Sequence, residues 1–188
     1  MADGEWEQAG GALHRRLREV IAERSLLTGG AFTLASGRQS SLFFDMKRTM
    51  LDPEGANLIA EAVLRRLEGI DVDAVGGLVM GAVPIVAVAC AKSFPARPLQ
   101  GFFVRKEAKD HGTARQIDGN LVRGARVAIL EDVTTTGGSA MLAVEAVRGA
   151  GAEIACVLTV VDRLEGAAAT FAAAGVRFEA LLTRDDFV

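Results

Sequence analysis

The chain has few cysteines, no long apolar run and no excess of basic residues. Only two of its 188 residues are cysteine, and their positions match no metal-binding spacing. No apolar run reaches the roughly 18 residues that a bilayer span requires. The net charge of −3 argues against a nucleic-acid surface as the main function. These absences predict a cytoplasmic protein with neither a membrane nor a nucleic acid as partner.

Two smaller features agree with this prediction. Cys90 and Cys156 both lie among alanine and valine residues, which predicts small buried hydrophobic side chains in a reducing compartment. Residues 1–11 are acidic and polar, so we expect no signal peptide there.

The length and a hydrophobic content of 50% predict one globular domain covering residues 1–188. From about residue 54 onward, short apolar runs alternate with helical patterns, which predicts an α/β fold with a mostly parallel sheet between helices. Gly29-Gly30 is expected to end the first helix, and residues 32–45 are expected to form two strands around Ser36-Gly37. The remaining expected strands are 74–80, 99–104, 126–130, 154–161 and 176–182; the helices are 13–21, 52–67, 83–92, 137–149 and 164–174.

In sheets of this kind, ligands bind beyond the carboxyl ends of the strands. The segment at 127–139, Val-Ala-Ile-Leu-Glu-Asp-Val-Thr-Thr-Thr-Gly-Gly-Ser, is such an end. Its glycines and the start of the following helix favour an anion, with hydroxyl groups available from Thr134, Thr135, Thr136 and Ser139. Glu131 and Asp132 suit sugar hydroxyls or a metal, so the ligand expected is a phosphorylated ribose. The segment lacks the lysine of a Walker A loop and the glycine spacing of a Rossmann fingerprint.

A second constellation follows the strand at 99–104. Arg105, Lys106, Lys109 and His111 lie within seven positions, as expected for a site that binds a diphosphate rather than a plain charged loop. His111 is suited to proton transfer at neutral pH. The following residues, 113–120, are predicted to form a mobile lid.

Three further segments leave alternatives open. Residues 76–84 are either a second anion-binding loop or a tight strand-to-helix packing site. Phe43 and Phe44 either cover a flat ring or belong to the ordinary core. Arg163, after the strand at 154–161, either clamps a carboxylate or lies on the surface.

Together these segments resemble one family. Residues 127–139 resemble the ribose-phosphate signature of type I phosphoribosyltransferases. Residues 32–45 resemble the hood hairpin of orotate phosphoribosyltransferases, and residues 105–112 resemble their mobile catalytic loop nearly residue for residue. The resemblance covers about residues 12–185.

The resemblance implies the type I phosphoribosyltransferase fold, a hood at about 12–50 and a mobile loop at about 105–120. It implies a transferase of pyrimidine biosynthesis that joins orotate to phosphoribosyl diphosphate and releases orotidine 5′-monophosphate and pyrophosphate. It also implies Mg²⁺, carried by the diphosphate substrate near Glu131 and Asp132 with no direct protein site, and a homodimer with shared active sites.

The resemblance also assigns the site residues. The catalytic residues implied are Lys109, His111 and Asp132. Phosphoribosyl diphosphate would contact Arg105, Lys106, Lys109, His111, Glu131, Asp132, Val133, Thr134, Thr135, Thr136, Gly137, Gly138 and Ser139. Orotate would contact Thr135, Arg163, Phe43 and Phe44.

Three positions depart from the family pattern. Ala35 and Met80 stand where many members have lysine, and Leu42 replaces an aromatic residue. Two other readings share the signature at 127–139: a phosphoribosyltransferase for a purine or uracil, and a regulator that senses phosphoribosyl diphosphate without catalysis. The hairpin and Arg163 argue against the first, and the four cationic residues at 105–111 argue against the second.

Overall fold

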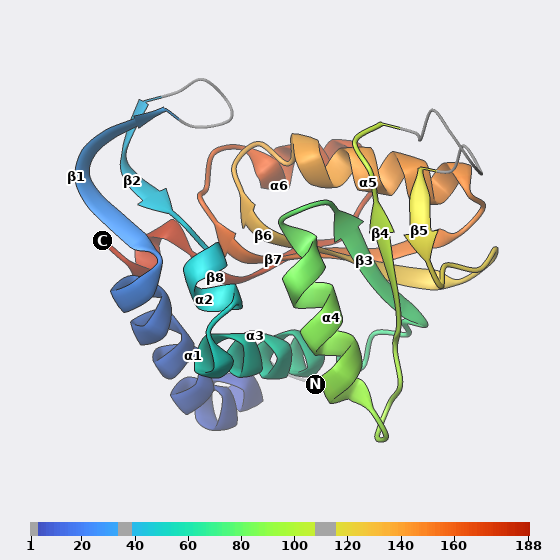
Figure 1. Cartoon of the computed structure of the whole chain (residues 1–188), viewed down its shortest axis with the longest axis horizontal. Coiled ribbons are helices and arrows are strands. Elements are labelled where there is room, and N and C mark those ends of the chain that lie inside the picture. Colours follow the sequence, from blue (N-terminus) through green and yellow to red (C-terminus); the bar gives the residue numbers. More distant parts are fainter. Residues whose placement is uncertain (1–3, 34–38, 108–115) are drawn as a thin grey trace.

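A six-stranded sheet forms the centre of the molecule in the computed structural model, which describes residues 4–33, 39–107 and 116–188 (Figure 1). The strand order is β5-β4-β3-β6-β7-β8, and every neighbouring pair is parallel except β4 and β5. The strands are β3 (Ala74–Leu78), β4 (Gln100–Val104), β5 (Ile117–Gly119), β6 (Arg126–Thr134), β7 (Glu153–Asp162) and β8 (Phe178–Thr183). The predicted α/β class with a mostly parallel sheet is confirmed.

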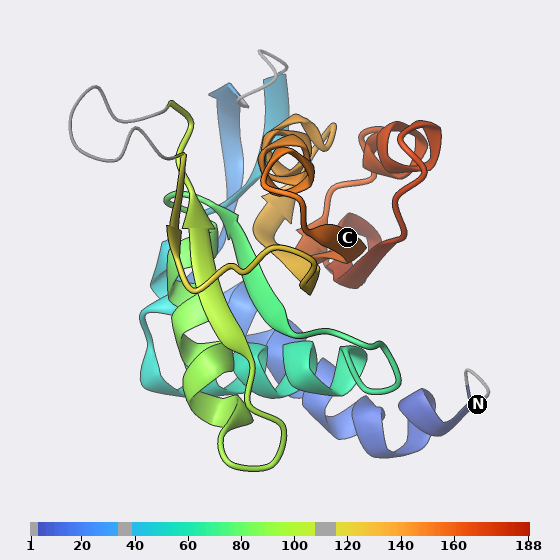
Figure 2. The ribbon, with the colours of Figure 1, turned by 90° about the vertical axis from the view of Figure 1, so that its right-hand side faces the viewer.

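Helices cover both faces of the sheet, so each face has its own apolar core (Figure 2). On one face lie α1 (Gly4–Arg24), α3 (Pro53–Arg66) and α4 (Ala82–Ser93); on the other lie α5 (Gly138–Gly149) and α6 (Ala167–Ala173). Burial on both faces explains why the central strands are continuous apolar runs rather than alternating patterns. All five residues of β3 are buried, for example.

The hood is an antiparallel hairpin that stands apart from the central sheet (Figure 1). It consists of β1 (Leu26–Thr33) and β2 (Gln39–Phe44), and the short α2 (Lys47–Met50) links it to α3. The expected hairpin is therefore present, although its expected turn at Ser36-Gly37 lies outside the described residues.

The expected role of Gly29-Gly30 as a helix stop is wrong. The helix ends at Arg24, and both glycines lie inside β1, where the strand register shifts between Thr28 and Phe32. Gly29 has a φ of 80°, which a bulge in a bent strand accommodates and most other residues avoid.

Other strands and helices begin or end at residues different from those expected, because tertiary contacts determine their ends. β6 runs to Thr134 instead of Leu130 because β7 pairs with it as far as Asp162. β5 and α2 were not expected, and α6 begins only at Ala167. The predicted start of α3 is confirmed: the Asp52 side chain accepts a hydrogen bond from the Gly55 N–H at 2.9 Å, with Pro53 in the first turn.

The cysteines agree in part with expectation. Cys156 is buried and Cys90 is half-buried, and neither forms a disulfide. Burial raises the pKa of the Cys156 thiol to about 11. In the described part of the chain, no helix is long and apolar enough to cross a membrane.

The order of the strands determines where a ligand site can form. β4 follows β3 along the chain on one side, whereas β6 pairs with β3 on the other. The connections therefore diverge between β3 and β6, which is where a ligand site is expected in such a sheet. The expected site segments after Val79 and Leu130 lie against each other there, since a Cβ at Gly81 would meet the Asp132 side chain.

Candidate active site

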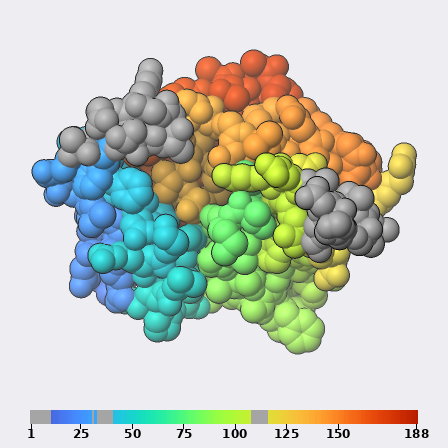
Figure 3. Space-filling model, turned by 45° about the horizontal axis from the view of Figure 1, so that its top comes forward, coloured from blue at the N-terminus to red at the C-terminus, as the bar shows by residue number. Residues whose placement is uncertain are grey.

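A pocket of about 410 Å³ lies at the carboxyl ends of β6 and β7, under the hood hairpin. In Figure 3 it corresponds to the recess between the blue and cyan hood and the gold to orange segment. Its lining comes from the hood, from the start of α2, from the β6–α5 segment and from the end of β7: Phe43, Phe44, Lys47, Glu131, Asp132, Val133, Thr135, Thr136, Gly137, Gly138, Ser139 and Arg163. Segments that lie far apart in the sequence thus meet around one cavity.

The start of α5 provides the anion-binding part of the pocket. Gly137 has a φ of 86° and precedes the helix, which begins at Gly138. A Cβ at Gly137 would approach the Phe171 ring to 2.9 Å, so both the backbone angle and the space require glycine. Gly138 and Ser139 line the pocket, so the first turn of the helix and its positive dipole end face the cavity.

Two carboxylates lie at the end of β6. Burial raises the pKa of Glu131 to about 7; a hydrogen bond from the Thr134 hydroxyl to its Oε2, at 2.7 Å, opposes the shift, and the neighbouring Asp132 adds to it. Burial also raises the pKa of Asp132, and the Val133 N–H and Lys47 oppose that shift. Both carboxyl groups therefore hold protons more tightly than they would in water. A bound cation, or hydroxyl groups that donate hydrogen bonds to the carboxylates, would lower both pKa values again.

Thr134 differs from the other members of its segment. It was expected to offer its hydroxyl to a phosphate, but its side chain is buried at 1% exposure and donates to Glu131 instead. It is the last residue of β6 and, unlike its neighbours Val133 and Thr135, it does not line the pocket. Thr135, Thr136 and Ser139 line the cavity as expected.

The loop after β3 lies against the same carboxylates. A Cβ at Gly81 would come within 2.5 Å of Asp132 Oδ1, so a larger residue at position 81 would require the Asp132 side chain to shift. Met80, which stands where many members of the family have lysine, is 77% exposed. The close approach explains the glycine at 81 by packing, and it also leaves the loop backbone beside the Asp132 carboxylate.

The hood phenylalanines lie between the pocket and the core. Phe43 lines the pocket and stacks on Phe32 with 5.6 Å between ring centroids. Phe44 also lines the pocket, yet it is only 6% exposed and packs edge-on against Phe187 at 5.1 Å. Phe44 therefore belongs to the core as well as to the pocket lining, and the covering of a flat ring by this pair stays a prediction.

Lys47 is a pocket residue that the sequence analysis missed. Its ammonium group lies 2.9 Å from Asp45 Oδ1, and this contact raises the lysine pKa, with a smaller contribution from Asp132. The sequence offered one signal, the position of Lys47 just after the Phe-Phe-Asp end of the hairpin. Nothing local indicated that this end would face the carboxylates of β6.

Arg163 is buried rather than on the surface. Its side chain is 4% exposed, lines the pocket and forms an ion pair with Glu165, with 2.9 Å between Nε and Oε1. The residue sits directly after β7, as its predicted role as a carboxylate clamp requires. Its pocket-facing position agrees with the functional alternative in the sequence analysis.

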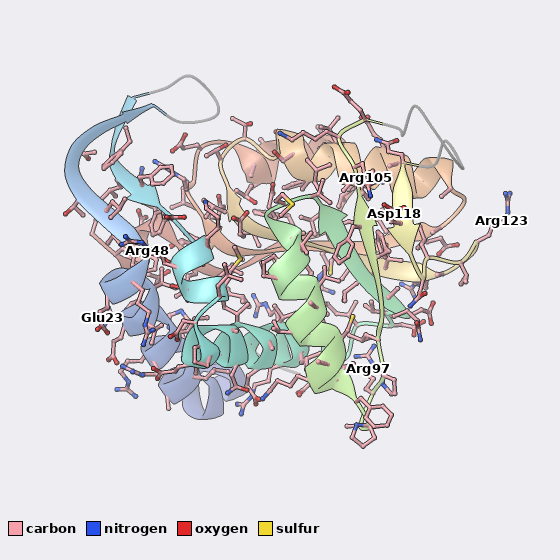
Figure 4. All side chains as sticks on the ribbon, viewed as in Figure 1. Glu23, Arg48, Arg97, Arg105, Asp118 and Arg123 are labelled. Carbon is pink, nitrogen blue, oxygen red and sulfur yellow. The ribbon has the colours of Figure 1, made fainter. Side chains whose placement is uncertain are left out.

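The start of the cationic segment, Arg105 and Lys106, follows β4 near the β5 edge of the sheet, whereas the pocket lies at the ends of β6 and β7. Arg105 forms an ion pair with Asp118 of β5, and Figure 4 shows these two side chains together at the upper ends of β4 and β5. Lys106 is exposed. Neither residue lines the pocket. Lys109 and His111 lie outside the described residues.

For a metal, the described part of the pocket offers Glu131 and Asp132. Outside the undescribed segments, no group of three or more His, Cys, Asp or Glu side chains is placed to hold an ion. Two carboxylates in a pocket with an anion-binding helix start fit a divalent cation that is also bound by its substrate.

Comparison with known proteins gives consistent results. No family model matches the chain. Orotate phosphoribosyltransferases from Bradyrhizobium diazoefficiens and Rhodopseudomonas palustris are each 50% identical over 182 residues, covering 94% of this chain and 97% of the relative.

Solved structures agree with the sequence relatives. The orotate phosphoribosyltransferase of Mycobacterium tuberculosis matches with a TM-score of 0.82 at 38% identity, covering 93% of this chain and 98% of that one. The same enzyme in complex with 5-phospho-α-D-ribosyl 1-diphosphate matches with a TM-score of 0.78 at 35% identity and the same coverage. Adenine phosphoribosyltransferase from Leishmania donovani matches in fold alone, with a TM-score of 0.67 at 16% identity over 92% of this chain and 81% of that one.

The pocket geometry, the shared fold and an identity of 50% across nearly the whole length lead to the same assignment. The chain belongs to the orotate phosphoribosyltransferase family, within the type I phosphoribosyltransferases.

Proposed function

We propose that the chain transfers the phosphoribosyl group of 5-phosphoribosyl 1-diphosphate to orotate, giving orotidine 5′-monophosphate and pyrophosphate in pyrimidine biosynthesis. One observation carries the proposal: a single pocket combines an anion-binding helix start, two buried carboxylates and a buried arginine under an aromatic hood. These groups match the phosphate, the ribose and the base carboxylate of the two substrates.

The ribose 5-phosphate would bind at the start of α5. The donors there are the backbone N–H groups of 133–139 and the hydroxyls of Thr135, Thr136 and Ser139. Thr134 would contribute only its backbone and the hydrogen bond that orients Glu131.

Orotate would lie between the hood and the end of β7. Its carboxylate is the partner we assign to Arg163, with Thr135 beside it and the ring against Phe43 and Phe44. A guanidinium group suits a carboxylate because two parallel N–H donors match its two oxygens.

In the reaction, the bond between ribose C1 and the diphosphate oxygen breaks, a bond from orotate N1 to C1 forms, and the proton of N1 passes to the departing diphosphate or to water. Positive charge develops on the ribose as the diphosphate leaves, and the carboxylates of Glu131 and Asp132, beside the ribose hydroxyls, stabilise it. When bound, Mg²⁺ would neutralise part of the diphosphate charge near these two residues.

The cationic segment would bind the leaving diphosphate. We assign this role to Arg105, Lys106, Lys109 and His111, and we retain Lys109 and His111, with Asp132, as the catalytic residues. Lys47 adds a further positive charge on the hood side, since it lines the pocket and lies close enough to Asp132 for their charges to interact.

We further propose the wider setting that family membership supports. Residues 1–188 would act as one domain, with the hood at about 12–50 and the mobile loop at about 105–120. Two such chains would form a homodimer with shared active sites in the cytoplasm.

The decisive experiment measures the loss of orotate absorbance with phosphoribosyl diphosphate and Mg²⁺, with adenine, guanine and uracil as alternative bases. We expect turnover with orotate alone and loss of activity when Mg²⁺ is chelated. Turnover of adenine, guanine or uracil in place of orotate would overturn the substrate assignment. Absence of turnover with every base would refute the catalytic proposal.

A further inference from the structure

The turn that follows β7 has an unusual backbone. Asp162 Oδ1 accepts a hydrogen bond from the Leu164 N–H at 2.9 Å, and Leu164 has a φ of 58°, the only positive φ among the described non-glycine residues. Gly166 also has a positive φ, of 110°. A leucine in the left-handed region is disfavoured, so the surrounding structure must hold it there.

The unusual backbone does not serve the packing of Leu164, because that side chain is 46% exposed. The backbone conformation at Leu164 instead determines where the side chains of its two neighbours, Arg163 and Glu165, lie. The turn brings their side chains together in a buried ion pair, with exposures of 4% and 13% and a distance of 2.9 Å from Nε to Oε1.

The ion pair is a poor source of stability. Transfer of both charges out of water offsets most of their attraction. Glu165 Oε2 is also buried without a hydrogen-bond partner among the described residues. A buried carboxylate oxygen without a hydrogen-bond partner costs stability, so the presence of Glu165 at this position is better explained by a role in function.

We propose that Glu165 is a positioning residue, which orients the Arg163 guanidinium so that it can receive the carboxylate of the pyrimidine ligand. This inference rests on the proposed function, because it assumes that the ligand of Arg163 is orotate or its nucleotide product. Glu165 itself does not line the pocket, so it acts through Arg163.

The geometry explains how the positioning works. A guanidinium group is planar and rigid, so an ion pair at one of its nitrogens limits where the other nitrogens can lie. Glu165 forms such an ion pair at Nε. The position of Arg163 at the pocket is then restricted, which favours two-point binding of a carboxylate.

The test compares two nucleotides that differ only in the carboxylate. Orotidine 5′-monophosphate carries it and uridine 5′-monophosphate lacks it, so their affinity ratio reports the contacts of the carboxylate, which we assign mainly to Arg163. Calorimetric binding is measured for the wild-type protein, Glu165→Gln and the control Glu153→Gln. Glu153 is exposed at the opposite end of the same strand, β7.

We expect Glu165→Gln to weaken orotidine monophosphate binding by about tenfold or more, because small misplacements of a binding group carry losses of this size. Uridine monophosphate binding should change less than about twofold, and Glu153→Gln should match the wild-type protein for both ligands. Kinetics should show a raised KM for orotate with an unchanged KM for phosphoribosyl diphosphate. If Glu165→Gln does not fold, Glu165→Asp provides the same comparison with the charge retained but displaced.

Equal weakening of both nucleotides, or no change in either, would overturn the positioning role. Failure of the proposed function gives a different result: the wild-type protein itself would then not turn over orotate and would not prefer orotidine monophosphate to uridine monophosphate.

Discussion

Glu131 and Asp132 are adjacent, half-buried acids, and their partial removal from water raises the pKa of each carboxyl group. A hydrogen bond from Thr134 and the charge of Lys47 offset the effect only in part. The pocket is therefore prepared for positive charge that it does not itself supply. The charge that develops on a ribose ring, or a divalent cation, would provide the missing partner.

The first prediction concerns the stability of the free protein as a function of pH. The Glu131 pKa rises from 4.5 to about 7, so below 4.5 its carboxyl is protonated in both the folded and unfolded chain. Above about pH 7 the folded protein must hold a buried charge, so the contribution of Glu131 to stability falls as pH rises. Glu131→Gln should be about 2 kcal/mol more stable than the wild-type protein near pH 8 and nearly equal to it below about pH 4.5.

Urea denaturation across this pH range provides the measurement. Glu145→Gln, on the exposed face of α5, is the matched control and should show no such divergence. A constant difference between Glu131→Gln and the wild-type protein at every pH would contradict the prediction.

At the scale of the elements, glycine determines how closely β3 approaches its neighbours. A Cβ at Gly76 would overlap the Phe102 ring of β4. A Cβ at Gly77 would overlap the Leu130 carbonyl oxygen of β6 and lie 2.6 Å from the Ala82 Cβ of α4. For residues 76–77, the packing alternative therefore holds: close contact between strands and helix explains these glycines without an anion.

The second prediction follows for Gly77→Ala. The added methyl group meets backbone on one side and a helix on the other, so it should destabilise the fold by about 1–3 kcal/mol or more. Gly149→Ala is the matched control, because no atom lies within 4 Å of a Cβ there and alanine is favoured in a helix. Denaturant midpoints should fall for the first variant and stay equal or rise for the second; equal midpoints for Gly77→Ala and the wild-type protein would refute the packing argument.

At the scale of the whole molecule, the pocket exists only because distant segments meet. The hood contributes Phe43 and Phe44, β6 and α5 contribute residues 131–139, and the turn after β7 contributes Arg163. A ligand that touches all three binds the folded chain alone and should stabilise it as a unit.

The third prediction concerns phosphoribosyl diphosphate with Mg²⁺. At about a hundredfold excess over its Kd, it should add about 2.7 kcal/mol and raise Tm by roughly 5–10 °C. Ser139→Asp should abolish this rise, because a carboxylate would occupy the anion site at the start of α5. Without ligand, the same variant should be as stable as the wild-type protein, since Ser139 is exposed and an acid is favourable in a first helical turn.

Thermal melts of both proteins, with and without ligand, test this prediction. A ligand-induced rise that persists in Ser139→Asp would place the phosphate elsewhere. A lower Tm for the free variant would mean that Ser139 has a structural role.

The sequence by itself determined the features that depend on local order. The apolar strand at 126–130 with its acids, threonines and glycines predicted a phosphate and sugar site, and Asp52-Pro53 predicted the start of α3. Both signals lie within a few residues, because caps, turns and anion-binding helix starts are local chemistry.

Only the tertiary structure decided the features that depend on which segments become neighbours. It placed Lys47 in the pocket, directed the Thr134 hydroxyl to Glu131 and put Gly29-Gly30 inside a strand. It also paired Arg163 with Glu165 in the turn after β7. None of these follows from sequence spacing, because strand pairing and burial join residues whose separation along the chain carries no information about their contact.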